Sequence, residues 1–287
     1  MKLIALDLDG TTLNSKKEIS EETVKTIKKA QEQGHIVMAL SGRAAHSITF
    51  ELKKHGLNCI VGANNGASLY VDDDLISMIT LTPEQHRKII MELDKEFIPF
   101  NMSTNKGVFA PKNWEERLRK VLSSGLVPEE NYSHKNFKIF TTPPHIYGHP
   151  IYDKTEEIID DESITIQKFL ILTFDPIQKK RIESFLNSIE GINIASATLN
   201  VDIMHVDAHK GSALKRMAEY YNIPLEDTIA IGDDANDIAM LNIAGLSIAM
   251  GNAEEEVKKY ADLVTLTNDE NGVAYAIEKY VLEKQTT

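Results

Sequence analysis

Short apolar runs along the chain are each followed directly by polar or glycine-rich residues. They lie at 3–6, 36–40, 59–63, 228–232 and 246–250. Continuous apolar runs of this length are typical of strands buried on both faces, as in parallel sheets. Helical patterns occupy the intervals, at 21–33 with Ser20 as N-cap, 44–55, 211–222, 235–244 and 272–284. Strands that alternate with helices predict an α/β fold built on a doubly wound parallel sheet.

The middle of the chain has a less regular pattern. Helical periodicity appears at 83–96, 113–123 and 176–189, and strand-like runs appear at 98–102, 107–110, 136–141, 168–174 and 192–197. This mixture predicts a second, α+β domain over 83–199, inserted into a core formed by 1–82 and 200–287. Arg117 and Arg119 of this domain are expected to be surface ion-pair partners.

The composition narrows the class of protein. The chain has 287 residues, 42% of them hydrophobic, and no apolar run approaches the ~20 residues of a membrane helix. Its formal net charge of -12 argues against nucleic-acid binding, which needs a basic surface. One cysteine, Cys59, fits a reducing compartment. We therefore expect a cytoplasmic protein that binds neither nucleic acid nor membrane, and its oligomeric state is left open.

The first apolar run leads directly into two carboxylates, Asp7 and Asp9, followed by a glycine. In an extended chain, residues two apart project to the same side, so both acids can face one pocket. A strand that ends in a simple turn is the alternative. Asp72 and Asp74 have the same spacing, but the strand-like runs on both sides of them predict a hairpin turn.

A second group of acids follows the apolar run at 228–232. Asp233, Asp234 and Asp237 lie with Asn236 where a strand gives way to a helix. A single acid would be enough to cap that helix. Unit charges ~4 Å apart interact by ~4 kcal/mol at an effective dielectric constant of 20, so a cluster of acids repels itself unless a cation joins it. Oxygen ligands alone favour a hard ion, with Mg²⁺ as the first choice.

Two further segments can bind an anion. Lys210 directly precedes a predicted helix, where a fixed ammonium group could hold a negatively charged ligand. Ser41, Gly42 and Arg43 follow a strand and open a helix, and the free N–H groups of such a turn suit a phosphate. The strand–turn–helix order places Ser41 to Arg43 at the carboxyl edge of the sheet, where α/β proteins bind ligands.

In their order along the chain, these residues resemble the four motifs of the haloacid dehalogenase superfamily. The matching positions are Asp7-x-Asp9-Gly-Thr, then Ser41, then Lys210, then Gly232-Asp233-x-x-Asn236-Asp237. The long insert resembles the C2-type cap of the Cof-type phosphatases, and 63–67 resembles their Asn-Gly-Ala element. His205 and Asp207 stand where the family has Pro and Gly, and Thr12 replaces an apolar residue.

The resemblance implies a Rossmann-like core and a phosphatase that uses an aspartyl-phosphate intermediate. Asp7 would be the nucleophile and Asp9 the general acid and base. Mg²⁺ would be held by the Asp7 carboxylate, the Asp9 carbonyl and Asp233. The phosphoryl group would be held by Ser41, Gly42, Lys210 and Asn236. Asp237, Thr11 and Arg43 would support these groups, and the partner would be a small phosphate ester.

Other functions share part of this pattern. A phosphomutase or phosphotransferase would form the same aspartyl-phosphate and pass the phosphoryl group to another hydroxyl. A signalling module phosphorylated on aspartate would need no inserted domain. A nicotinamide- or ATP-binding site of the common types is disfavoured, because the chain has neither G-x-G-x-x-G after its first strand nor G-x-x-x-x-G-K-[ST].

Overall fold

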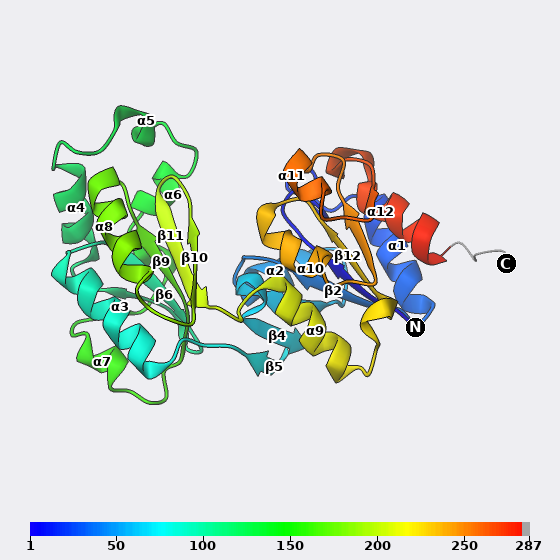
Figure 1. Ribbon diagram of the computed structural model, residues 1–287, viewed down its shortest axis with the longest axis horizontal. Helices are drawn as coiled ribbons and strands as arrows, with labels where there is room; N and C mark the ends of the chain where they lie inside the picture. Colours follow the sequence, from blue (N-terminus) through cyan, green and yellow to red (C-terminus); the bar gives the residue numbers. More distant parts are fainter. Residues whose placement is uncertain (283–287) are drawn as a thin grey trace. The chain divides into compact units, whose positions relative to one another are not determined.

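The computed structural model describes residues 1–282 and divides the chain into two compact units. Met1–Met78 and the chain from Ala208 onward form the core unit, and Ile79–Asp207 forms the inserted unit (Figure 1). The sequence placed the two boundaries after residues 82 and 199 instead. The second boundary moves because residues 200–205 form a strand of the inserted unit.

The core unit is built on an eight-stranded sheet with the order β14-β13-β12-β1-β2-β3-β4-β5. The strands from β14 to β3 are parallel, and β4 and β5 add an antiparallel hairpin at one edge. The strand bounds are β1 Leu3–Leu6, β2 Ile36–Leu40, β3 Ile60–Ala63, β4 Ser68–Val71, β5 Asp74–Met78, β12 Thr228–Gly232, β13 Leu246–Ala249 and β14 Leu263–Val264. The predicted doubly wound α/β core is confirmed.

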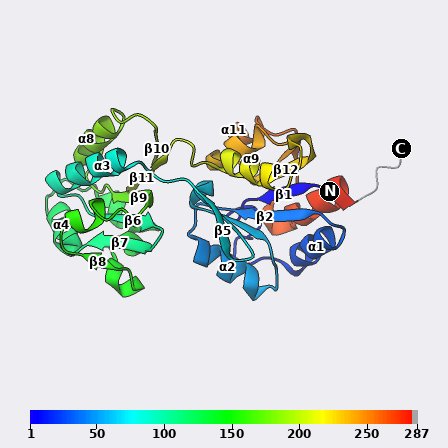
Figure 2. The same cartoon turned by 90° about the horizontal axis from the view of Figure 1, so that it is seen from below.

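Helices cover both faces of this sheet (Figure 2). On one face lie α1 Glu21–Glu32, α2 Ala45–Lys54 and α12 Gly272–Ile277; on the other lie α9 Lys210–Tyr220, α10 Ile238–Leu241 and α11 Glu255–Lys258. Short turns complete the unit: η1 Asn64–Gly66, η3 Leu225–Asp227, η4 Ala235–Asp237, η5 Asn268–Glu270 and the π-helical η6 Glu278–Leu282. The helix predicted at 235–244 is thus divided between η4 and α10, and the last two residues of the predicted helix 272–284 lie outside the described chain.

The local sequence explains where helix α1 begins and why strand β1 is apolar throughout. Ser20 caps α1 as predicted, because its Oγ accepts a hydrogen bond of 3.1 Å from the Thr23 N–H. Successive residues of β1 alternate between the two apolar layers, so Ile4 packs with α1 and α12, and Ala5 packs with α9. A strand with apolar contacts on both faces requires the continuous apolar run seen in the sequence.

The inserted unit has a mostly antiparallel six-stranded sheet with the order β10-β11-β9-β6-β7-β8. Its strands are β6 Phe100–Thr104, β7 Gly107–Pro111, β8 Ile151–Tyr152, β9 Ile166–Leu172, β10 Ile192–Ser196 and β11 Asn200–His205. Its helices are α3 Pro83–Lys95, α4 Trp114–Leu122, α5 Glu129–Tyr132, α6 Phe137–Thr141, α7 Glu156–Ile159 and α8 Pro176–Leu186, with the short turn η2 Pro144–Tyr147. Residues of α3 and α8 share an apolar cluster with β6, β9 and β11. The predicted α+β insert is confirmed.

Two expectations for this unit were wrong. Residues 137–141 form helix α6 rather than a strand, because Phe137 and Phe140, three residues apart, both pack on the cluster around Phe174, while Ile139 faces solvent. Arg117 is 4% exposed and not a surface residue. Its Nη2 lies 2.5 Å from Oδ1 of Asp94, so the ion pair exists, but its arginine is buried within the unit.

Within residues 1–282, no helix combines the length and the apolar character needed to cross a membrane.

Candidate active site

The candidate site lies where three neighbouring parallel strands of the core end. β1 pairs with β12 on one side and with β2 on the other, in parallel register. Asp7, Ser41 and Asp233 directly follow these three strands. The carboxyl ends of adjacent parallel strands meet at one edge of the sheet, which is why residues far apart in sequence come together here.

The turn after β1 is fixed by its own residues and by Asp233. Gly10 has a φ of +87°, and a Cβ at this position would overlap the Asp233 carboxylate. Thr11 Oγ1 donates a 2.7 Å hydrogen bond to Asp233 Oδ1. Thr12 Oγ1 donates a 2.5 Å hydrogen bond to the Asp7 carbonyl oxygen. The threonine that departs from the family pattern therefore ties the turn back to Asp7.

Lys210 joins two carboxylates at the bottom of the site. Its Nζ lies 2.5 Å from Oδ1 of Asp7 and 2.5 Å from Oδ1 of Asp237. The side chains of Lys210 and Asp237 are 0% exposed. Burial opposes the charge of Lys210, but the carboxylates of Asp7 and Asp237 outweigh it and raise the pKa of this lysine above its usual value. The lysine is therefore a fixed ammonium group, as its predicted role requires.

Burial raises the pKa of two acids in this cluster. Burial raises the pKa of Asp7 to about 8; Asp237 and Asp233 act in the same direction, and Lys210 acts against them. Burial also raises the pKa of Asp233 to about 6, although Thr11 opposes this change. Both shifts mean that the cluster holds its negative charge at a cost, which a bound cation would relieve.

Asp237 organises the turn that carries Asp233. Its Oδ2 accepts hydrogen bonds from the N–H groups of Asp233 at 2.9 Å and Asp234 at 3.0 Å. Asp234 in turn caps the short helix η4. Capping engages two of the three acids, because Asp234 and Oδ2 of Asp237 form a reciprocal capping box. Asp233 and the Oδ1 atom of Asp237 remain directed into the cluster.

Asp9 has surroundings unlike those of Asp7. Arg43 binds it with two hydrogen bonds, from Nε at 2.7 Å and from Nη2 at 2.6 Å, and Lys17 Nζ lies 2.9 Å away. Burial opposes the charge of Asp9, but Arg43 and Lys17 together hold its pKa below the usual value. Its side chain is 39% exposed against 7% for Asp7. The two acids of the first motif thus differ in accessibility and in bonding.

A cavity of about 220 Å³ opens between these strand ends. Its lining residues are Asp7, Asp9, Ser41, Gly42, Arg43, Asp234 and Asn236. The other predicted site residues do not line the cavity but join the same network: Lys210 bonds with Asp7 and Asp237, and Thr11 bonds with Asp233. All ten predicted residues are therefore brought together, although this geometry leaves their chemical roles as predictions.

The donor set fits a hard cation. One carboxylate oxygen from each of Asp7, Asp233 and Asp237 lies within 4.8 Å of the others. Three buried or half-buried carboxylates without thiolate or imidazole neighbours in the set suit Mg²⁺ or a similar ion. The sequence assigned Asp237 to a supporting role, and its Oδ1 lies 2.5 Å from Lys210 Nζ.

Sequence reasoning missed Lys17, which bonds with Asp9 across a loop. Lys17 adopts a left-handed φ of 62°, and nothing in its local pattern distinguishes it from a solvated lysine. Asp234 was read as part of the acidic group but was not assigned to the site that it lines. Both omissions concern residues whose role depends on loop geometry rather than on a strand or helix pattern.

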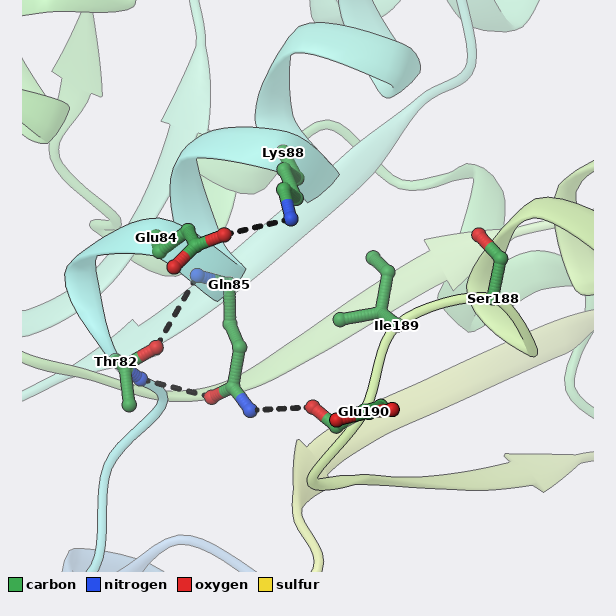
Figure 3. A pocket seen from close by; sticks show the side chains of 7 residues that line it. All are labelled: Thr82, Glu84, Gln85, Lys88, Ser188, Ile189 and Glu190. Atoms are coloured by element: carbon green, nitrogen blue, oxygen red, sulfur yellow. Dashed lines mark hydrogen bonds and ion pairs between the residues drawn. The ribbon is translucent and has the colours of Figure 1, made fainter.

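A second hollow lies in the inserted unit, beside the start of α3 (Figure 3). Thr82 and Gln85 form a reciprocal capping box, Gln85 also bonds with the Glu190 carbonyl oxygen, and Lys88 pairs with Glu84. The capping box fixes the start of α3, and the exposed pair of Glu84 and Lys88 lies along the same helix.

Comparison with known proteins identifies the family. The haloacid dehalogenase-like hydrolases match this chain over residues 4–277. The chain belongs to this family. The resemblance inferred from the four motifs is confirmed, and the long insert is the cap domain of its Cof-type members.

The curated relatives are phosphatases. The chain is 33% identical to phosphatase YwpJ of Bacillus subtilis, with 97% of this chain and 99% of the relative covered. It is 32% identical to 5-amino-6-(5-phospho-D-ribitylamino)uracil phosphatase YwtE of the same organism, covering 97% and 98%. A solved haloacid dehalogenase-like hydrolase from B. subtilis matches with a TM-score of 0.76 and 32% identity, covering 98% of this chain and 100% of that one. The homologues are thus phosphoric monoester hydrolases that act on small phosphorylated metabolites.

Proposed function

We propose that the chain is a Mg²⁺-dependent phosphatase of a small phosphorylated metabolite, such as a sugar phosphate, and that it works through an aspartyl-phosphate on Asp7. The observation that carries the proposal is the pairing of Asp7 with buried Lys210 at the edge of a cavity also lined by Asp9 and Ser41. A carboxylate next to a fixed ammonium group and an anion-binding turn suits nucleophilic attack on a phosphate ester.

In the first step, Oδ2 of Asp7 forms a bond to phosphorus while the ester P–O bond breaks. Lys210 holds the other carboxylate oxygen, Oδ1, and so fixes the direction of attack. For this step Asp9 must carry a proton, so binding of the ester must displace Arg43 and Lys17, which hold its pKa below the usual value in the free protein. Asp9 then gives this proton to the leaving oxygen, which departs as an alcohol. The Ser41 hydroxyl, the Gly42 N–H and Lys210 bind the phosphoryl oxygens, where the charge of the transition state gathers.

In the second step, Asp9 takes a proton from a water molecule, and the oxygen of that water attacks phosphorus. The bond between phosphorus and Asp7 breaks, inorganic phosphate leaves, and both carboxylates return to their starting states. Asp7, Asp233 and the Asp9 carbonyl oxygen would hold Mg²⁺, which neutralises charge on the phosphoryl group when bound. Asp237 orients Lys210, and Asn236 contributes a further donor at the rim of the cavity.

We assign the selection of the leaving group to the inserted domain. We also place the protein in the cytoplasm. The relative YwtE is a 5-amino-6-(5-phospho-D-ribitylamino)uracil phosphatase, which supports a small phosphorylated metabolite as the substrate class. A cytoplasmic location is supported by the single cysteine, which cannot form an internal disulfide.

The test is release of inorganic phosphate from a panel of phosphorylated metabolites in the presence of Mg²⁺, with no acceptor added. We expect turnover of several sugar or polyol phosphates, and loss of turnover when EDTA removes the metal. A phosphomutase would release phosphate only slowly under these conditions and would respond to an added sugar hydroxyl. A flat panel, or turnover that is indifferent to EDTA, contradicts the proposal.

A further inference from the structure

The turn that follows β3 has an unusual backbone. Asn64, Asn65 and Gly66 have φ values of 49°, 56° and 89°, so three successive residues are left-handed. Such conformations are uncommon outside glycine and persist where the surroundings impose them, often at functional sites. The contacts around this turn must therefore impose its shape.

Backbone hydrogen bonds join this turn to both sides of Gly42. The N–H of Asn65 donates to the Ser41 carbonyl oxygen at 2.8 Å, and the N–H of Asn64 donates to the Arg43 carbonyl oxygen at 2.9 Å. The left-handed conformation is what allows two successive N–H groups to reach carbonyls two residues apart on the neighbouring loop. The phosphoryl-binding turn at 41–43 is thus held at both ends.

The side chain of Asn65 adds a third connection. Its Oδ1 accepts a 3.2 Å hydrogen bond from Nδ2 of Asn236, on the loop after β12. The same Oδ1 lies 3.2 Å from the position that a Cβ on Gly42 would occupy, so the amide packs directly on this glycine. Asn65 therefore links two loops that line the cavity without lining it itself.

On its other side, the turn is fixed to the helix that begins at Lys210. A Cβ on Gly66 would lie 2.5 Å from Ala213 Cβ, which shows how closely the turn approaches the first turn of α9. Arg216 of the same helix donates from Nη2 to the Gly66 carbonyl oxygen and from Nη1 to Ser77 Oγ at 2.6 Å. Burial lowers the pKa of Arg216, and within residues 1–282 no ion pair involves its guanidinium group. A partly buried cation is here used to hold a backbone carbonyl.

We propose that Asn65 and Arg216 are positioning residues, which hold the phosphoryl-binding turn 41–43 in place relative to Lys210. The inference rests on the proposed phosphatase function, because it assumes that Ser41, Gly42 and Lys210 bind one phosphoryl group. Small displacements of such donors weaken binding of the transition state more than binding of the ground state.

The first experiment replaces Asn65 by glycine, which removes the amide but tolerates the left-handed backbone. Asn222→Gly is the matched control, because Asn222 also has a left-handed φ of 53° and lies outside the cavity lining. The readouts are kcat and KM for p-nitrophenyl phosphate with Mg²⁺, and inhibition constants for orthovanadate and inorganic phosphate. For Asn65→Gly we expect kcat to fall about 10- to 100-fold and the vanadate inhibition constant to rise by a similar factor, with a much smaller change for phosphate. Asn222→Gly should match the wild type in all of them.

The second experiment alters Arg216 and uses Lys215→Ala, on an exposed position of the same helix, as its control. Arg216→Ala should lower kcat several-fold, and Arg216→Lys should lie between Arg216→Ala and the wild type. The effects of Asn65→Gly and Arg216→Ala should be less than additive in the double variant, because both act through one turn. If Asn65→Gly fails to fold, Arg216→Lys supplies the same set of readouts.

The outcomes separate this inference from the proposed function. A wild-type kcat and vanadate inhibition constant in Asn65→Gly and Arg216→Ala would overturn the inference alone. So would a lower melting temperature with an unchanged ratio of vanadate to phosphate inhibition, because that result describes a structural role only. A wild-type protein that hydrolyses no phosphate ester overturns the proposed function, and this inference with it.

Discussion

The core sheet contains two pairs of acids with the same spacing and opposite environments. Asp7 and Asp9 follow β1 in the middle of the sheet, and Asp7 is 5% exposed. Asp72 and Asp74 lie at the turn between β4 and β5 at one edge, and both are exposed. The spacing of two carboxylates therefore says little about their chemistry, which depends on where the strand lies in the sheet.

The difference follows from strand order. β1 has a parallel neighbour on each side, so its end meets the ends of β12 and β2, with Lys210 nearby. β4 and β5 form a hairpin in which Asp72 and Asp73 have φ values of 50° and 70°. Two left-handed residues are what a tight hairpin turn of this kind requires, and Asp tolerates that conformation. The hairpin predicted for this segment is confirmed.

The largest expected effect comes from replacing Asp7, the first acid of the pair after β1. Asp72, the first acid of the hairpin pair, is its control. Asp7→Asn should reduce phosphate release on the order of 10⁴-fold or more, because the nucleophile is lost. Asp72→Asn should leave turnover within twofold of the wild type, because this side chain only accepts a hydrogen bond from Asn58. Turnover of p-nitrophenyl phosphate with Mg²⁺ measures both. If folded Asp7→Asn protein retained its activity, Asp7 would not be the nucleophile and the two pairs of acids would not differ in function.

Replacing the second acid of each pair, Asp9 or Asp74, should give a smaller difference in kcat. Asp9→Asn keeps the shape of the side chain but cannot transfer a proton, so kcat should fall by about 10²- to 10⁴-fold. Asp74→Asn, at the same spacing in the hairpin, should not change kcat. A leaving group of low pKa, such as p-nitrophenol, needs little protonation, so the deficit of Asp9→Asn should be larger for alkyl phosphates. An equal deficit for both kinds of ester would argue against the acid role.

Two lysines, one bonded to Asp7 and one to Asp73 in the hairpin turn, should contribute very differently to stability. Lys210→Met leaves Asp7 and Asp237 buried without their ammonium partner and should lower the free energy of unfolding by about 3–5 kcal/mol in metal-free buffer. Lys53 is 62% exposed and pairs with Asp73 at 2.6 Å, so Lys53→Met should cost at most about 1 kcal/mol. Urea unfolding with EDTA present measures both values. Equal losses would show that burial does not distinguish the pairs.

The smallest effect concerns the hairpin backbone. Asp73→Gly relieves a left-handed aspartate while it removes an exposed ion pair, so stability should stay within about 1 kcal/mol of the wild type. Asp74→Gly places glycine in a strand and should lower stability by about 0.5–1 kcal/mol. In thermal unfolding, Asp73→Gly should have a higher melting temperature than Asp74→Gly. The reverse order would contradict the turn geometry assigned to this hairpin.

Much of the architecture could be predicted from local patterns. The continuous apolar runs identified the strands β1, β2, β3, β12 and β13 because burial on both faces requires such runs. Residues 137–141 were misassigned because Phe137, Ile139 and Phe140 fit either period over so short a segment. Strand β11 was placed in the wrong domain, because antiparallel pairing with β9 and β10 cannot be read from residues 200–205 alone.

The sequence by itself determined the family, the order of the motifs and the acids that follow each buried strand. Only the tertiary structure decided which of these side chains meet. Lys210 reaches Asp7 across 203 positions, and Arg43 reaches Asp9 across 34. It also decided that Lys17 joins Asp9 and that Asn65 connects the loops of Gly42 and Asn236. Such contacts depend on strand order and loop geometry, which arise from pairing between distant segments, whereas local patterns record only the burial and periodicity of each segment.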